Sequence, residues 1–168
     1  ISGDADDTIG SLAALDAIAY AIDNDADIIN ASWGGGPPFI FFQELINTAL
    51  DNETLFIAAA GNNDGRDNDL TPYYPCNYEN VLCIGSITAG DRRSSFSNIG
   101  ASVDLFAPGS NILSTLPGDN YGRIGGTSMA APFAAAAAAL VKTARPDFSA
   151  VEVREQLRST GASIGAAN

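Results

Sequence analysis

The spacing of apolar residues along the chain alternates between a helical and a strand-like pattern. Apolar residues at three- and four-residue intervals, or long apolar segments, predict helices over Ser11–Asn24, Phe41–Asn52, Met129–Ala144 and Ser149–Ser159. Short, nearly continuous apolar runs are typical of strands buried on both faces, and they occupy Asp27–Ser32, Thr54–Ala60, Val81–Ile87 and Val103–Ala107. Long polar loops are expected at Gly61–Pro75 and Pro108–Ile124.

The order of these segments predicts the fold class. Helices that alternate with buried strands are typical of an α/β domain, here a three-layer sandwich with a mostly parallel sheet. The segment Met129–Ala144 carries no charge before Lys142, so we expect a central helix packed closely on that sheet. Ile1–Thr8 reads as a loop, and no strand precedes the first helix. We therefore expect residues 1–168 to be part of one domain whose N-terminal strands are missing.

Length and charge narrow the choice of partners. The chain has 168 residues, enough for one domain or most of one, and its net charge is −12, from 20 acidic and 8 basic residues. Nucleic acids and anionic membranes are bound by clusters of Lys and Arg, so this composition argues against both. The longest apolar run, Ala130–Val141, is too short to cross a bilayer. We expect a secreted monomer.

The two cysteines, Cys76 and Cys83, are separated by a short polar segment that can form a turn. They can pair in a disulfide, which would place the protein in an oxidising compartment. The alternative is two reduced cysteines, with one buried in a strand. We favour the disulfide.

The segment Gly125–Pro132 (GGTSMAAP) carries the strongest chemical signal. The glycine pair allows a sharp turn and the close approach of another chain. Ser128 follows it at the start of an apolar helix, where the helix dipole favours negative charge. Pro132 fits the first helical turn, which needs no N–H donor at that position. From spacing alone, Ser128 is either a nucleophile or an N-cap residue.

Four stretches together resemble one known family. They read IINASWGG over 28–35, AAAGN over 58–62, VDLFAPG over 103–109 and GTSMAAP over 126–132. In order and in rough spacing they are similar to the motifs of the subtilisin-like (S8) serine peptidases, and the resemblance covers nearly the whole chain. α/β-Hydrolases use a Gly-x-Ser-x-Gly motif instead, and Ala130 stands here where its second glycine belongs.

The resemblance implies a serine endopeptidase that forms an acyl-enzyme, without an organic cofactor. Ser128 would be the nucleophile, and the Asn62 side chain would donate to the oxyanion together with the Ser128 backbone N–H. The expected substrate-binding walls are two short segments that carry Ser32, Trp33 and Gly34 on one side and Ala59, Ala60 and Gly61 on the other. Trp33 departs from the aliphatic residue usual at its position.

The chain also departs from the family in lacking the rest of the catalytic triad. A serine peptidase of this kind needs a His base and an Asp that orients it, and the sequence contains no histidine. In the family both residues lie N-terminal to the motifs seen here. Either the chain is a fragment, inactive alone, or it is a catalytically dead module retained for protein binding.

Two acidic clusters could hold a structural calcium ion. One comprises Asp4, Asp6 and Asp7, and the other Asp64, Asp67 and Asp69. Loop carboxylates at alternate positions can bind Ca²⁺, although neither cluster has EF-hand spacing. Solvated loop acids are the simpler interpretation, and no metal ligand is assigned.

Overall fold

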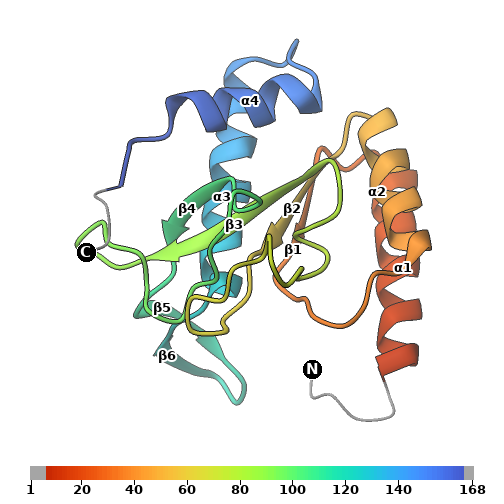
Figure 1. Cartoon of the computed structure of the whole chain (residues 1–168). Helices are drawn as coiled ribbons and strands as arrows, with labels where there is room; N and C mark the ends of the chain where they lie inside the picture. Colours follow the sequence, from red (N-terminus) through yellow and green to blue (C-terminus); the bar gives the residue numbers. More distant parts are fainter. Residues whose placement is uncertain (1–6, 165–168) are drawn as a thin grey trace.

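The computed structural model describes residues 7–164, which contain one main sheet, a hairpin and four helices (Figure 1). The helices are α1 (Asp7–Asp23), α2 (Ile40–Asp51), α3 (Thr127–Ala144) and α4 (Ala150–Thr160). The strands are β1 (Ile28–Ala31), β2 (Leu55–Ala59), β3 (Val81–Ile87), β4 (Leu105–Pro108), β5 (Ile112–Leu116) and β6 (Asn120–Ile124).

The main sheet has the strand order β1-β2-β3-β4, and every pair is parallel. Helix α2 connects β1 to β2, which is the crossover that parallel neighbours require. Irregular segments connect β2 to β3 and β3 to β4. Because all four strands run the same way, their carboxyl ends lie along one edge of the sheet.

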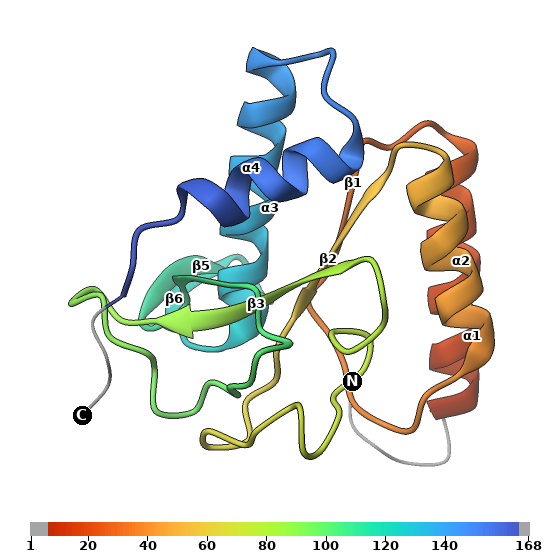
Figure 2. The same cartoon turned by 45° about the horizontal axis from the view of Figure 1, so that its top comes forward.

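Helices cover both faces of the sheet, because successive side chains of β2 belong alternately to two apolar cores. Phe56 and Ala58 belong to the apolar core under α1 and α2. Leu55, Ile57 and Ala59 belong to a second core under α3 and α4. Figure 2 shows α1 and α2 together on one side and α3 with α4 on the other. The fold class is therefore the predicted three-layer α/β sandwich with a parallel sheet.

The central helix α3 packs against all four strands of the sheet. Its buried positions are filled by small side chains, Ala130, Ala131, Ala134 and Ala138, which are at most 7% exposed. Side chains of this size let the helix axis approach the sheet closely, which explains the alanine run. The prediction of a closely packed central helix is confirmed. Within residues 7–164, no helix is long and apolar enough to span a membrane.

One predicted loop is wrong. The segment Pro108–Ile124 was expected to be irregular, but it contains the antiparallel hairpin β5–β6. The turn between the two strands contains Gly118 and Asp119 with φ of 77° and 56°, values suited to glycine and tolerated by aspartate. The Pro117–Asn120 turn residues could have predicted this hairpin, but its strands alternate half-buried and exposed positions instead of being continuously apolar.

The two cysteines form a disulfide with a Cα–Cα distance of 4.9 Å, so the prediction of a bridge is confirmed and the alternative of reduced cysteines is wrong. Cys83 lies in the middle of β3 and is completely buried, while Cys76 belongs to the loop that connects β2 to β3. The bridge therefore fastens that long loop to the sheet.

Candidate active site

The predicted site residues meet at one edge of the sheet. Ser32 directly follows β1, Asn62 follows β2 by three residues, and Ser128 lies in the first turn of α3. The carboxyl ends of parallel strands are where α/β domains place their ligand-binding residues. The fold thus brings together three side chains that are up to 96 positions apart in the chain.

Ser128 and Ser32 are joined by two reciprocal hydrogen bonds. The Ser128 hydroxyl donates to the Ser32 carbonyl at 2.9 Å, and the Ser32 hydroxyl donates to the Ser128 carbonyl at 2.8 Å. The N-cap of α3 is Gly126, so the interpretation of Ser128 as only a capping residue is wrong. A backbone carbonyl is a very weak base, so it orients the Ser128 hydroxyl without activating it.

The Asn62 side chain has a defined orientation. Its Oδ1 accepts hydrogen bonds from the Thr127 backbone N–H at 2.8 Å and from the Thr127 hydroxyl at 3.0 Å. Because a backbone N–H can only donate, the amide oxygen must face Thr127, which leaves Nδ2 as a donor pointing elsewhere. The same Thr127 hydroxyl accepts from the Gly61 N–H at 3.1 Å. Asn62 therefore caps α3 with one end and offers N–H donors with the other.

Two nitrogen atoms that carry N–H groups lie close to the small volume beside Gly126. A methyl group added there would lie 3.6 Å from Asn62 Nδ2 and 3.7 Å from the Ser128 backbone nitrogen. The Ser128 N–H lies in the first turn of α3, where backbone donors have no intrahelical acceptor, and at the positive end of the helix dipole. The arrangement is suited to stabilising an oxygen that becomes negative next to Ser128.

The ring of Tyr73 lies between one glycine of each predicted wall segment, Gly34 of Ser32–Gly34 and Gly61 of Ala59–Gly61. A methyl group added at Gly34 would lie 2.5 Å from Tyr73 Cε1, and one added at Gly61 would lie 3.1 Å from Tyr73 Cδ2. Burial raises the pKa of the Tyr73 phenol, although the positive charge of Arg66 opposes the shift. Trp33 packs against Phe42 of α2, with ring centroids 5.6 Å apart.

Two acidic residues of the loop after β2, Asp67 and Asp69, accept hydrogen bonds from backbone N–H groups. Asp69 accepts hydrogen bonds from the backbone N–H groups of Ala101 and Ser102, and the bond from Ala101 is the main cause of its lowered pKa. Asp67 accepts from the Asp69 backbone. In the part of the chain described here, no group of three His, Cys, Asp or Glu side chains is arranged to hold a metal ion. The side chains of Asp4, Asp6 and Asp7 lie outside the described residues.

Comparisons with known proteins agree with this geometry. The chain matches the peptidase S8 or subtilase family over residues 2–167. The chain belongs to the subtilase family. Subtilisin NAT of Bacillus subtilis subsp. natto and a subtilisin of Bacillus pumilus are each 37% identical to it over 151 residues, or 90% of this chain. A solved structure of a cold-adapted subtilisin-like serine proteinase is 33% identical, with a TM-score of 0.78 over 86% of this chain.

The subtilase relatives are longer than this chain. The matched region spans 40% of subtilisin NAT, 55% of the Bacillus pumilus subtilisin and 52% of the cold-adapted proteinase. The 168 residues thus correspond to about half of these relatives, and they include the segments of Ser128, Asn62 and Ser32.

Sequence reasoning missed two residues of the candidate site. Thr127 fixes the orientation of Asn62, and its position directly before Ser128 was a usable signal. Tyr73 lies between the two wall segments, but it comes from a loop without periodicity, whose path no local pattern predicts.

Proposed function

We propose that this chain carries the nucleophile and the oxyanion hole of a serine endopeptidase. The observation that supports this most directly is that two donor nitrogens, Asn62 Nδ2 and the Ser128 backbone N, lie close to the same volume beside Gly126. In the proposed reaction, Ser128 Oγ attacks the carbonyl carbon of a peptide bond. The carbonyl oxygen becomes negative, and the two donors stabilise it before the amine leaves and an acyl-enzyme remains.

The reaction also requires a base that accepts the Ser128 proton and returns it to the leaving amine. None of the 168 residues is a histidine, and Lys142 lies 14 residues further along α3, about 20 Å away at a helical rise of about 1.5 Å per residue. We propose that a His and its orienting Asp are supplied by a part of the protein that precedes these residues. Residues 1–168 alone are then inactive, because a serine hydroxyl without an adjacent base is a poor nucleophile.

A serine-directed fluorophosphonate tests this proposal. The full-length protein should become labelled at Ser128 and hydrolyse a peptide substrate, while residues 1–168 alone should do neither. Ser128→Ala should abolish labelling, and Ser95→Ala, at an exposed serine, should leave it unchanged. A full-length protein that is folded but neither labelled nor active would instead support a catalytically dead binding module. Labelling of Ser128 in the 168-residue chain would refute the need for a further segment.

We propose that the substrate side chain before the cleaved bond, P1, enters between Ser32–Gly34 and Ala59–Gly61. Small wall residues alone would leave room for a large apolar P1 group, but the Tyr73 ring lies between the walls. Wild-type protein should therefore prefer Ala or Ser at P1. Tyr73→Ala should make room for a larger side chain at P1. It should therefore raise kcat/KM for substrates with Phe or Leu at P1 by about 10-fold or more, because their side chains would then contact the walls.

A scan of peptides that differ only at P1, with wild type and Tyr73→Ala compared, measures this preference. A strict preference for Arg or Lys in wild type would contradict the proposed pocket, because neither wall segment carries an acidic residue to receive a cation.

We further propose that the protein is secreted, acts as a monomer on polypeptides, and neither binds nucleic acid nor attaches to membranes. The disulfide supports an oxidising compartment, and the net charge of −12 opposes binding to polyanions.

A further inference from the structure

Two asparagine side chains, Asn68 and Asn98, are completely buried behind the proposed oxyanion hole. Burying a side-chain amide destabilises the folded protein unless its polar atoms form hydrogen bonds. Within residues 7–164, neither side chain forms a hydrogen bond with Gly126 or Ser128. What they hold is the backbone that carries Asn62.

Asn98 contacts that backbone on both sides of Asn62. Its Nδ2 donates to the Ala60 carbonyl at 3.0 Å, and its Oδ1 accepts from the Asn63 N–H at 2.8 Å. Its own backbone N–H donates to the Gly61 carbonyl at 3.0 Å. One residue thus bonds three of the four positions from Ala60 to Asn63, and Asn62 is the one that it does not bond.

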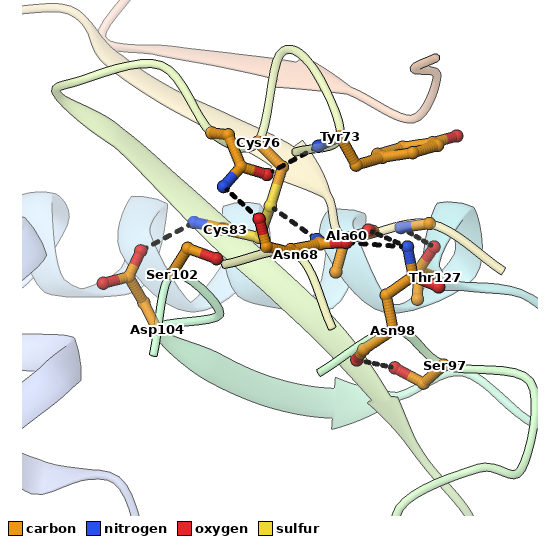
Figure 3. The surroundings of a disulfide bond; sticks show 12 residues. Ala60, Asn68, Tyr73, Cys76, Cys83, Ser97, Asn98, Ser102, Asp104 and Thr127 are labelled. Atoms are coloured by element: carbon orange, nitrogen blue, oxygen red, sulfur yellow. Dashed lines mark hydrogen bonds between the residues drawn. A yellow bond between two sulfur atoms is a disulfide. The ribbon is translucent and has the colours of Figure 1, made fainter. Parts of the chain in front are cut away.

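Asn68 supports the same turn and also binds Asn98. Its Nδ2 donates to the same Ala60 carbonyl at 2.9 Å, and its Oδ1 accepts from Asn98 Nδ2 at 2.9 Å. Its Nδ2 also lies 3.6 Å from the sulfur of Cys76 in the disulfide. Figure 3 shows Asn68 and Asn98 directed toward Ala60, with the disulfide next to Asn68.

The fit around Gly61 shows how closely the Asn98 amide approaches this turn. A methyl group added at Gly61 would lie only 2.5 Å from Asn98 Nδ2, and Gly61 has a φ of 103°, where a side chain is strained. The turn is therefore shaped to the buried amide. Asn62 itself is exposed, and the hydrogen bonds of its side chain in this structure go to Thr127 alone.

We propose that Asn98, together with Asn68, is a positioning residue that holds the Ala60–Asn63 turn so that Asn62 Nδ2 faces the oxyanion. The inference rests on the proposed function of Asn62. Oxyanion donors act over distances of about 2.7–3.1 Å, and a misplacement of about 1 Å can cost on the order of 100-fold in rate. A turn held from both sides by buried amides meets that requirement, whereas a solvated loop does not.

A double-mutant cycle in the full-length protein tests the proposal. Asn98→Ser should lower kcat by about 10- to 100-fold with KM nearly unchanged. In an Asn62→Ala background, the same change should lower kcat less than about twofold, because the donor that Asn98 positions is absent. Val153→Ala, a truncation of a buried side chain in α4, is the control for general destabilisation and should give equal effects in both backgrounds.

Hydrogen exchange at the Asn63 N–H is a readout that needs no activity. It should become faster in Asn98→Ser and remain slow in Val153→Ala. An inactive full-length protein would contradict the proposed function. Unchanged exchange at the Asn63 N–H in Asn98→Ser would independently overturn the positioning role. If Asn98→Ser does not fold, Asn68→Ser replaces it in the same double-mutant cycle. Equal losses of kcat in both backgrounds, or no loss in either, would overturn the proposal.

Discussion

Replacing Asn62 tests the proposed oxyanion hole most sharply, because its two ends have separate tasks. Nδ2 is the proposed donor to the oxyanion, while Oδ1 caps α3 by accepting two hydrogen bonds from the buried Thr127. Asn62→Leu removes both tasks, and Asn62→Asp removes only the donor. A comparison of the two variants therefore separates a loss of catalysis from a loss of stability.

The expected sizes follow from these contacts. Loss of the matching donor in a subtilisin costs about 10²–10³ in kcat, or about 2.7–4 kcal/mol, and we expect the same for Asn62→Leu with little change in KM. The Leu variant also deprives Thr127 of its acceptor, which should lower the free energy of unfolding by about 1–3 kcal/mol. Asn62→Asp keeps that acceptor and adds a carboxylate at the N-terminus of α3, worth about 0.3–1 kcal/mol of stabilisation.

Steady-state kinetics with a peptide substrate and denaturant unfolding of the same preparations measure both effects. We expect Asn62→Asp to be at least as stable as wild type, yet at least as impaired in kcat as Asn62→Leu, since a negative charge opposes the oxyanion. A normal kcat in Asn62→Asp would refute the donor role. A raised KM with unchanged kcat in both variants would show that Asn62 binds substrate instead.

Three further predictions concern stability. Unfolded, unreduced protein should show no free thiol, and the double change Cys76→Ala/Cys83→Ala should lower the free energy of unfolding by about 2–3 kcal/mol; a titration that finds two thiols would contradict the bridge. Thr54→Val should raise the free energy of unfolding by about 1 kcal/mol in a denaturation experiment, because the buried Thr54 hydroxyl has no hydrogen-bond partner among the described residues; a loss would reveal a partner. Burial raises the pKa of the Asp104 carboxyl group, although the hydrogen bond from the Cys83 N–H opposes the shift. The folded protein therefore binds the carboxyl proton more tightly than the unfolded protein does. Stability should fall as the pH rises from the unfolded-state pKa to the higher folded-state pKa. Asp104→Asn should show a smaller fall in melting temperature over that range, and an unchanged fall would assign it to other groups.

Sequence patterns predicted most of the elements because β2, β3 and α3 are buried in the core, which leaves a continuous run of apolar residues in the sequence. The prediction for β3 has the observed bounds, Val81–Ile87, and α3 begins two residues before the predicted Met129. The hairpin within 108–124 was missed because its side chains are only half buried. The family resemblance located Ser128, Asn62 and Ser32, since their motifs are local. The buried bonds of Asn98 reach the Ala60 carbonyl across 38 positions, a pairing that no local pattern contains.

The burial of the disulfide makes it a reporter of how often the site region opens. A thiolate reductant must approach a sulfur atom directly, but Cys76 is only 3% exposed and Cys83 is fully covered. Reduction under native conditions therefore has to wait until a local opening exposes one of the two sulfur atoms, so its rate at saturating reductant equals the rate of that opening. The loop that carries Cys76 also carries Asn68 and Tyr73. A simple alkylation time course thus gives the lifetime of the closed state around the disulfide, behind the proposed catalytic centre.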